Sequence, residues 1–177
     1  MKGSERRSGI VVPMPELEPL VGEHRRAWDP VAALGAGAHV TVLFPFAPPD
    51  TIDDATLERV GRALAGRGPF AVSFEAVREF PDHVLYLAPE PADRFRALTQ
   101  VLAAAFPEYP PYRGQFAEII PHLTVTHRPD APIADVAATV RTQLPVAADA
   151  SRVEVWVEGV DDRWSTRASF PLSDART

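Results

Sequence analysis

The sequence predicts an α+β fold of two lobes related by a pseudo-twofold axis, with a central cleft between them. Segments rich in β-forming residues alternate with helical segments, and each half of the chain gives the order strand-helix-strand-helix-strand. The middle strand of each half opens with a His-x-Thr motif, at His39 and Thr41 and again at His122 and Thr124. Because repetition of this kind indicates a duplicated unit, we expect one domain of two similar lobes.

Apolar periodicity and turn residues place the individual elements. In chain order, we expect a strand at 10–14, a helix at 15–27, a strand at 39–44, a helix at 50–65, a strand at 70–80, a strand at 83–87, a helix at 91–106, a strand at 119–126, a helix at 133–144, a strand at 153–160 and a final hairpin strand at 163–172. Pro15 fits the first turn of its helix, where a missing N–H costs little. The domain then spans 10–172, with lobe halves at about 10–80 and 83–172, between a disordered segment 1–9 and a tail 173–177.

Composition limits the classes of partner. The chain of 177 residues is 46% hydrophobic and 24% charged, as in ordinary globular proteins. A net charge of -6 disfavours long nucleic acid, whose binding needs many Lys and Arg contacts to phosphates, so an RNA partner would be short. The absence of cysteine excludes disulfides, thiolate metal sites and a cysteine nucleophile. With no signal peptide and no membrane-length apolar run, we expect a cytoplasmic protein, and nothing demands more than a monomer.

The two His-x-Thr motifs predict one shared site. Residues i and i+2 of a strand point to the same face, so His39 shares a face with Thr41, and His122 with Thr124. The residues between and after them are apolar and can bury the opposite face against helices. Each strand therefore presents an imidazole and a hydroxyl to the cleft.

This set of groups suits the cleavage of a phosphodiester. A histidine has an unperturbed pKa near 6.5 and can act as acid or base. With His39 and His122 on opposite sides of one phosphate, one ring can deprotonate a nucleophile while the other protonates the leaving oxygen, each contributing ~10²–10⁴-fold. The hydroxyls of Thr41 and Thr124 can donate to the non-bridging oxygens. The chemistry requires neither a metal nor a cofactor.

At these motifs the chain resembles the two-histidine (2H) phosphoesterases, the superfamily that contains the bacterial 2'-5' RNA ligase-like proteins. The resemblance is carried by Ala-His-Val-Thr-Val-Leu-Phe at 38–44, by Ile-Pro-His-Leu-Thr-Val at 120–125 and by the order of elements. It implies that His39 and His122 are catalytic, that Thr41 and Thr124 contact phosphate, and that the substrate is a nucleotide or short RNA with a 2',3'-cyclic phosphate or a 2'-5' linkage. Nothing in the residues distinguishes hydrolysis from ligation, or the acid from the base.

Other residues have open assignments. Phe44 could stack a base at the rim of the cleft or pack in the core. Tyr112 and Arg113 lie in a long loop, and Arg113 is a candidate phosphate contact, with plain solvation as the alternative. Thr126 continues the face of the second motif and is expected to line the cleft. The competing functions are a nucleotide- or phosphate-binding module with little turnover and a metal-dependent hydrolase using His122 with the nearby His127, which no suitably placed carboxylate supports.

Overall fold

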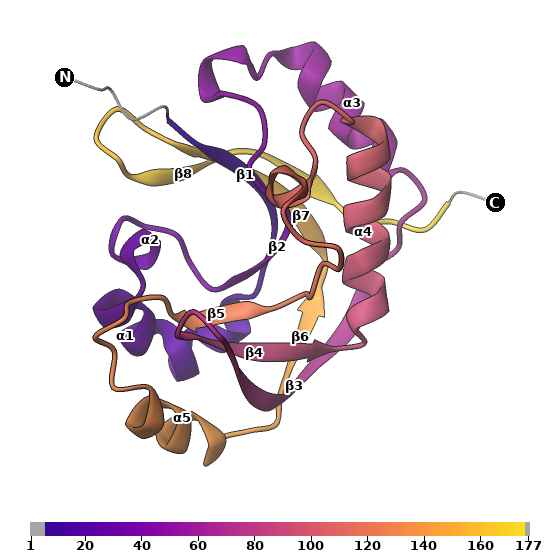
Figure 1. Cartoon of the computed structure of the whole chain (residues 1–177). Helices are drawn as coiled ribbons and strands as arrows, with labels where there is room; N and C mark the ends of the chain where they lie inside the picture. Colours follow the sequence, from indigo (N-terminus) through magenta and orange to yellow (C-terminus); the bar gives the residue numbers. More distant parts are fainter. Residues whose placement is uncertain (1–5, 176–177) are drawn as a thin grey trace.

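Two four-stranded antiparallel sheets form the protein in the computed structural model, which describes residues 6–175 (Figure 1). Sheet A has the strand order β2-β1-β7-β8 and sheet B the order β5-β4-β3-β6. The strands are β1 (Ser8–Pro13), β2 (His39–Leu43), β3 (Phe70–Phe80), β4 (Val84–Glu90), β5 (Leu123–Thr126), β6 (Val146–Ala150), β7 (Arg152–Glu158) and β8 (Trp164–Pro171). This confirms the predicted α+β fold of two similar lobes.

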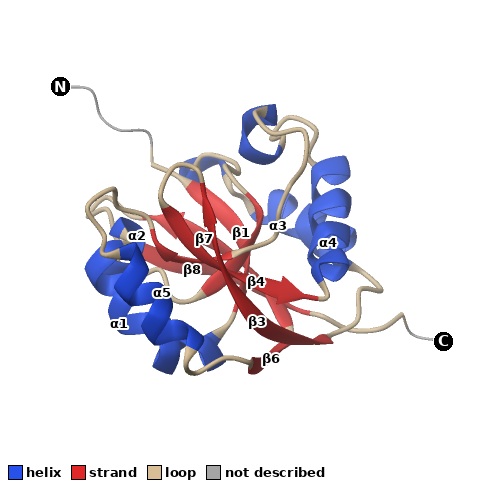
Figure 2. Ribbon diagram, turned by 60° about the horizontal axis from the view of Figure 1, so that its bottom comes forward, coloured by secondary structure: helices blue, strands red, loops and turns tan. Residues whose placement is uncertain are grey.

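The helices interlock the two lobes. They are α1 (Glu18–Trp28), α2 (Pro30–Ala33), α3 (Asp54–Leu64), α4 (Ala92–Ala105) and α5 (Ile133–Arg141). Helix α1 joins β1 to β2 in sheet A, yet it contacts β5 of sheet B and lies beside α5 (Figure 2). Conversely, α4 joins β4 to β5 in sheet B, yet it contacts β2 of sheet A and lies beside α3. Each lobe therefore has one helix that packs against the sheet of the other lobe, so the two lobes form one packed structure.

The lobes do not follow the two predicted halves of the chain. Strand β3 was expected in the lobe of residues 10–80, but it pairs with β4 and β6 of the other sheet. The reason is the short turn after Phe80, where the N–H of His83 donates to the Phe80 carbonyl at 3.1 Å. A turn this tight makes β3 and β4 antiparallel neighbours. Strand β7 in turn pairs with β1, so each sheet takes strands from both halves.

Several elements differ from expectation in their boundaries, and one strand is additional. Strand β1 begins at Ser8, whose buried hydroxyl donates to the Ala47 carbonyl at 2.5 Å, so Ser8 and Gly9 are ordered within β1 rather than part of a disordered segment. Residues 1–5 of that segment lie outside the described range. Strand β5 is shorter than the predicted 119–126, because Pro121 has no N–H for the ladder. The edge strand β6 was not expected.

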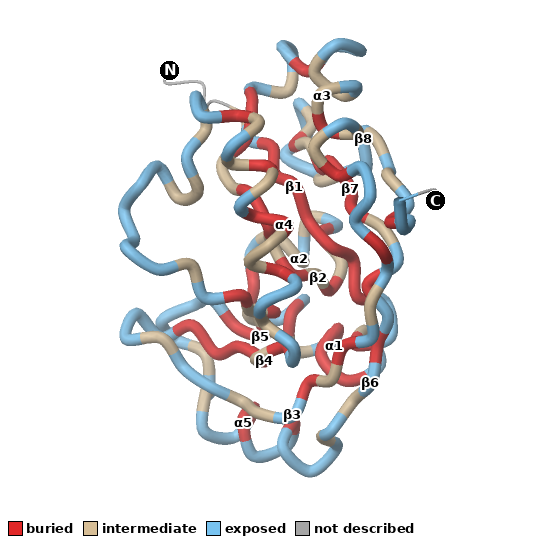
Figure 3. The backbone as a smooth tube through the Cα atoms, turned by 90° about the vertical axis from the view of Figure 1, so that its right-hand side faces the viewer, coloured by how far each residue is buried: buried red, intermediate tan, exposed pale blue. Residues whose placement is uncertain are grey.

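The main core fills the space between the sheets and their covering helices. Buried aliphatic and aromatic side chains come from nearly every strand and helix, and Figure 3 shows the buried strands inside a shell of exposed loops. A second, smaller cluster contains Val11, Ala36 and Trp156, with Val31 and Trp164 packed against it. It lies apart from the main core, and Trp156 also contacts His39, the first motif histidine.

Candidate active site

The two His-x-Thr motifs meet where the sheets meet. His39 opens β2 and His122 directly precedes β5; these strands are the edges of their sheets and contact each other. The side chains of His39, Thr41, His122 and Thr124 are half-buried, whereas the apolar residues between them are buried. Segments distant in the sequence thus bring two imidazoles and two hydroxyls to neighbouring strands.

Each histidine ring is held by the same backbone contact. Nδ1 of His39 lies 2.7 Å from the Gly37 carbonyl oxygen, and Nδ1 of His122 lies 2.7 Å from the Ile120 carbonyl oxygen. Since a carbonyl oxygen only accepts, the proton of each neutral ring is on Nδ1. In both rings Nε2 is then the nitrogen with the free lone pair, and it is the atom that can take a proton from a nucleophile.

Burial keeps both rings neutral. Burial, followed by the positive charge of Arg25, lowers the pKa of His39 to about 3, against the raising effect of the Gly37 carbonyl. The charge of His122 also lowers the pKa of His39, so the two rings are close enough to interact electrostatically. Burial likewise lowers the pKa of His122, and the Ile120 carbonyl opposes that shift.

Aromatic side chains support both rings. The edge of His39 packs on Trp156 of β7, with the ring centroids 4.9 Å apart. His122 packs in the same way on Phe80 of β3 at 5.1 Å and on Tyr86 of β4 at 5.7 Å, and Phe80 and Tyr86 stack on each other at 4.1 Å. The contacts of these aromatic residues with the histidines could not be predicted from the sequence, because they come from strands whose pairing the chain order does not reveal.

A β-bulge follows the first motif. Val11 of β1 pairs with Thr41, but the next residue, Ile10, pairs with Leu43, so β2 has one extra residue between these two pairs. The bulge turns Leu43 into the core, where it is 1% exposed. Phe44 then follows on the face of Thr41, although regular alternation would place it on the opposite face.

The second motif has the same bulge. Tyr86 of β4 pairs with Thr124, and the next residue, Leu85, pairs with Thr126. Thr126 therefore takes the place that Leu43 has in the first motif, and it is fully buried with no hydrogen-bond partner for its hydroxyl. The expectation that Thr126 lines the cleft is wrong, because the bulge turns it away from the face of Thr124.

The long loop before the second motif meets the end of the first. Phe44 is half-buried against Gly9, and its carbonyl accepts from the backbone N–H of Tyr112 at 2.6 Å. Burial raises the pKa of Tyr112 to about 12. The Tyr112 ring packs edge-on against the ring of the exposed Phe116, with the ring centroids 5.6 Å apart. Tyr112 and the exposed Arg113 have φ values of 48° and 56°, a left-handed conformation that is unfavourable for both. The loop thus brings Tyr112 to Phe44 and leaves Arg113 at the surface.

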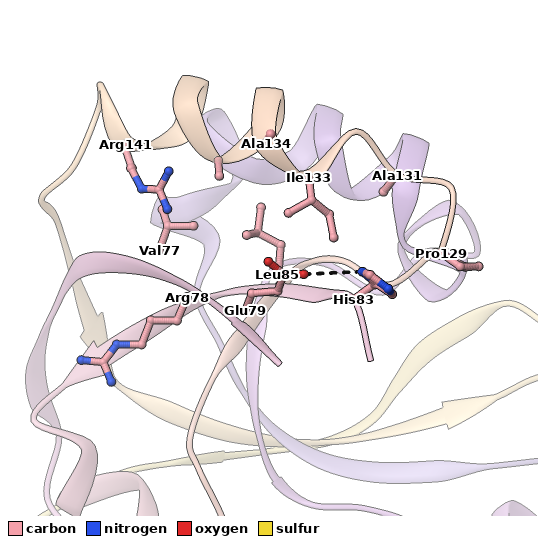
Figure 4. A pocket seen from close by; sticks show the side chains of 11 residues that line it. Val77, Arg78, Glu79, His83, Leu85, Pro129, Ala131, Ile133, Ala134 and Arg141 are labelled. Atoms are coloured by element: carbon pink, nitrogen blue, oxygen red, sulfur yellow. Dashed lines mark ion pairs between the residues drawn. The ribbon is translucent and has the colours of Figure 1, made fainter. Parts of the chain in front are cut away.

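A separate cavity lies away from the two motifs. A pocket of about 580 Å³ opens between α5 and the β3–β4 hairpin, on the helix-covered side of sheet B (Figure 4). Val77, Leu85 and Ile133 line it, with His83 toward one end and Arg141 toward the other, and neither motif histidine takes part. Cavity volume alone therefore does not identify the candidate site.

Residues 6–175 lack two features that would change the interpretation of the site. They contain no group of three or more His, Asp or Glu side chains arranged to hold a metal ion. Within the same range, no helix has the length and apolar character needed to cross a membrane.

The fold and the paired His-x-Thr motifs are those of the two-histidine (2H) phosphoesterase superfamily. The family model of the 2'-5' RNA ligase superfamily matches residues 13–162, so the chain belongs to that superfamily. A search of curated proteins gave no match.

Solved structures share the fold at low sequence identity. Protein TT0787 of Thermus thermophilus is 18% identical with a TM-score of 0.65, and the match covers 96% of this chain and 100% of that one. E. coli LigT complexed with NADP+ is 15% identical with a TM-score of 0.64, covering 97% and 100%. E. coli LigT complexed with 3'-AMP is 13% identical with a TM-score of 0.62 and the same coverage. At this identity the likeness concerns the fold.

Proposed function

We propose that this protein is a metal-independent phosphodiesterase that hydrolyses 2',3'-cyclic phosphates of nucleotides or RNA ends, with His39 and His122 as the paired acid and base. One observation carries the proposal. Two histidines with the same Nδ1 contact, each with a threonine two residues on, stand on contacting strands. The E. coli LigT structures with NADP+ and 3'-AMP support a nucleotide as the ligand.

The proposed reaction needs one neutral ring and one protonated ring. Nε2 of the neutral ring takes a proton from water as its oxygen bonds to phosphorus. The protonated ring gives its proton to the ribose oxygen as the P–O bond breaks, so charge and protons balance. Since burial disfavours both imidazolium forms, the negative phosphate itself would stabilise the one that is required. Thr41 and Thr124 would donate to the non-bridging oxygens. In ligation a 5'-hydroxyl takes the place of water in the same step, and the reverse of that step cleaves a 2'-5' linkage and re-forms the cyclic phosphate.

The test is hydrolysis of 2',3'-cyclic nucleotides in the presence of a chelator. We expect His39→Ala and His122→Ala each to lower kcat by ~10²-fold or more, because each removes one proton-transfer group. His127→Ala changes an exposed histidine close to the second motif and should leave the rate unchanged. Near-normal rates for both motif variants would refute the acid–base assignment. Loss in His127→Ala together with inhibition by the chelator would instead favour the metal-dependent hydrolase.

The same preparations separate an enzyme from a binding module. Calorimetry with nucleoside monophosphates measures binding, and the hydrolysis assay measures turnover. Binding without turnover of any cyclic phosphate would identify a nucleotide-binding module. Turnover that depends on both histidines supports the enzyme.

A further inference from the structure

We propose that Glu18 and Arg25 of α1 are positioning residues that hold the segment 36–38 and thereby fix the His39 ring in its Nδ1–H tautomer. The inference rests on the proposed catalytic role of His39. It assigns a function to two charged side chains that lie in no contact with the reacting atoms.

The two side chains bind the peptide groups on either side of Gly37. Nη1 of Arg25 donates to the carbonyl of Ala36 at 3.1 Å, and the carboxylate of Glu18 accepts from the N–H of Ala38. The Gly37 carbonyl, which belongs to the same peptide group as the Ala38 N–H, is the acceptor for the His39 ring. A side chain at 37 would meet Glu18 at 3.3 Å, so the segment lies tightly against the helix. The position of the ring's acceptor is therefore set by α1.

Arg25 is itself fixed. It is 1% exposed, its Nη2 pairs with Asp29 Oδ2 at 3.0 Å, and its Nε has no hydrogen-bond partner. Asp29 Oδ1 accepts from the N–H of Val31, at the start of α2. Burying such a pair is costly, and apolar side chains in its place are often neutral or stabilising. A need for the guanidinium at Ala36 explains why a buried charge stands there.

The charged groups that act on the pKa of His39 are Arg25 of α1 and His122 of the second motif. Glu18 of α1 binds the Ala38 N–H before His39, and Glu154 of β7 binds the indole N–H of Trp156, whose ring packs on His39. The carboxylate of Glu154 is occupied by three donors of its own sheet. The charge of Arg25 is the largest influence after burial in lowering the pKa of His39. Arg25 thus acts on the ring in two ways, through the Gly37 carbonyl and through its field.

His122 provides an internal reference. Its ring has the same 2.7 Å contact, with the Ile120 carbonyl. Burial and the charge of His127 lower the pKa of His122, whereas the Ile120 carbonyl and the charge of Asp82 raise it. No arginine is among these influences. Replacing the side chains of Glu18 and Arg25 should therefore alter the first ring and spare the second.

The experiment records the ring ¹⁵N and ¹³C signals of both histidines by NMR as the pH is varied. The main variant is Arg25→Met combined with Asp29→Asn, which removes both buried charges together and leaves neither unpaired. Glu18→Ala is a second variant at a partly exposed position, and Glu18→Gln keeps an acceptor for Ala38. Arg62→Met removes the same charge from an exposed helical position on α3, where the arginine pairs with the exposed Glu58, and is the matched control.

We expect the double variant to raise the pKa of His39 and lower its Nδ1–H population, with His122 unchanged. Glu18→Ala should lower the Nδ1–H population, Glu18→Gln should restore it, and Arg62→Met should match the wild type. In hydrolysis, kcat should fall about 10- to 100-fold in the first two variants with KM little changed. Wild-type tautomer and titration of His39 in both variants would overturn the inference. A wild-type protein without turnover would refute the proposed function alone, because the NMR result stands without it.

Discussion

At the scale of single residues, the next prediction concerns the hydroxyl groups of the two motif threonines. Thr41 and Thr124 each stand beside an imidazole, and valine has nearly their shape without the hydroxyl. We expect Thr41→Val and Thr124→Val each to lower kcat by ~10²-fold, because a donor to the developing charge on phosphate is lost. The free energy of unfolding should change little in either variant. Unchanged kcat in both would remove the threonines from the proposed site.

Thr126 provides the contrasting case on the same strand. Its hydroxyl is buried without a partner at the position that Leu43 occupies in the first motif. Thr126→Val should raise the free energy of unfolding by ~1–3 kcal/mol, because an unsatisfied polar group leaves the core. Denaturant unfolding measures this, and the hydrolysis rate should stay at the wild-type value. A destabilised variant would show that the hydroxyl has a partner in solution.

Arg113 separates substrate binding from backbone conformation. Its φ of 56° suits asparagine, which tolerates the left-handed region. If the guanidinium binds a substrate phosphate, Arg113→Asn should raise KM about tenfold with kcat unchanged, since a charged hydrogen bond is worth ~1.5–3 kcal/mol. The melting temperature should not fall. Wild-type KM would leave Arg113 as a surface residue.

The sequence predicted which histidines lie together in the candidate site better than it predicted their surroundings. The repeated motif named His39 and His122, because the spacing of a strand fixes which side chains share a face. It could not name Trp156 or Phe80, whose contacts with the rings depend on which strands pair. Nor could it name Arg25, which in sequence resembles any charged residue on an exposed helix.

At the scale of elements, strong periodicity gave reliable predictions and weak periodicity did not. Helix α4 at Ala92–Ala105 lies within the expected 91–106, because its apolar face repeats clearly. Strand β6, of sequence Val-Ala-Ala-Asp-Ala, was missed because it has few β-forming residues and exists through pairing with β3. The two β-bulges that follow the motifs could not be predicted either, because one extra residue in a strand does not change the composition of the segment.

At the scale of the whole molecule, the exchange of helices makes the two lobes depend on each other. Helix α1 holds the segment before the first motif while packing on β5 of the other sheet, which carries the second motif. A displacement of α1 would therefore disturb both motifs. This arrangement follows from tertiary packing, and the chain order alone suggested two separate halves.

The lowered pKa of His39 predicts how stability responds to pH. In the unfolded chain this histidine binds a proton near pH 6.5, but in the folded protein only near pH 3. Below pH 6.5 the unfolded state therefore binds more protons than the folded state. The free energy of unfolding then decreases as the pH is lowered, by at most about 1.4 kcal/mol per pH unit for one histidine. The shift of His122 acts in the same direction.

Urea unfolding at pH 7 and pH 5 isolates this effect when the wild type is compared with His39→Asn. Asparagine keeps a donor for the Gly37 carbonyl and has no charge to gain, so its loss of stability between the two pH values should be smaller. The carboxylates with lowered pKa, namely Asp53, Glu108, Glu154 and Glu158, titrate below their ordinary values and contribute little in this window. Equal losses in both proteins would mean that the imidazole of His39 is as easily protonated in the folded state as in water, and that burial does not hold it neutral.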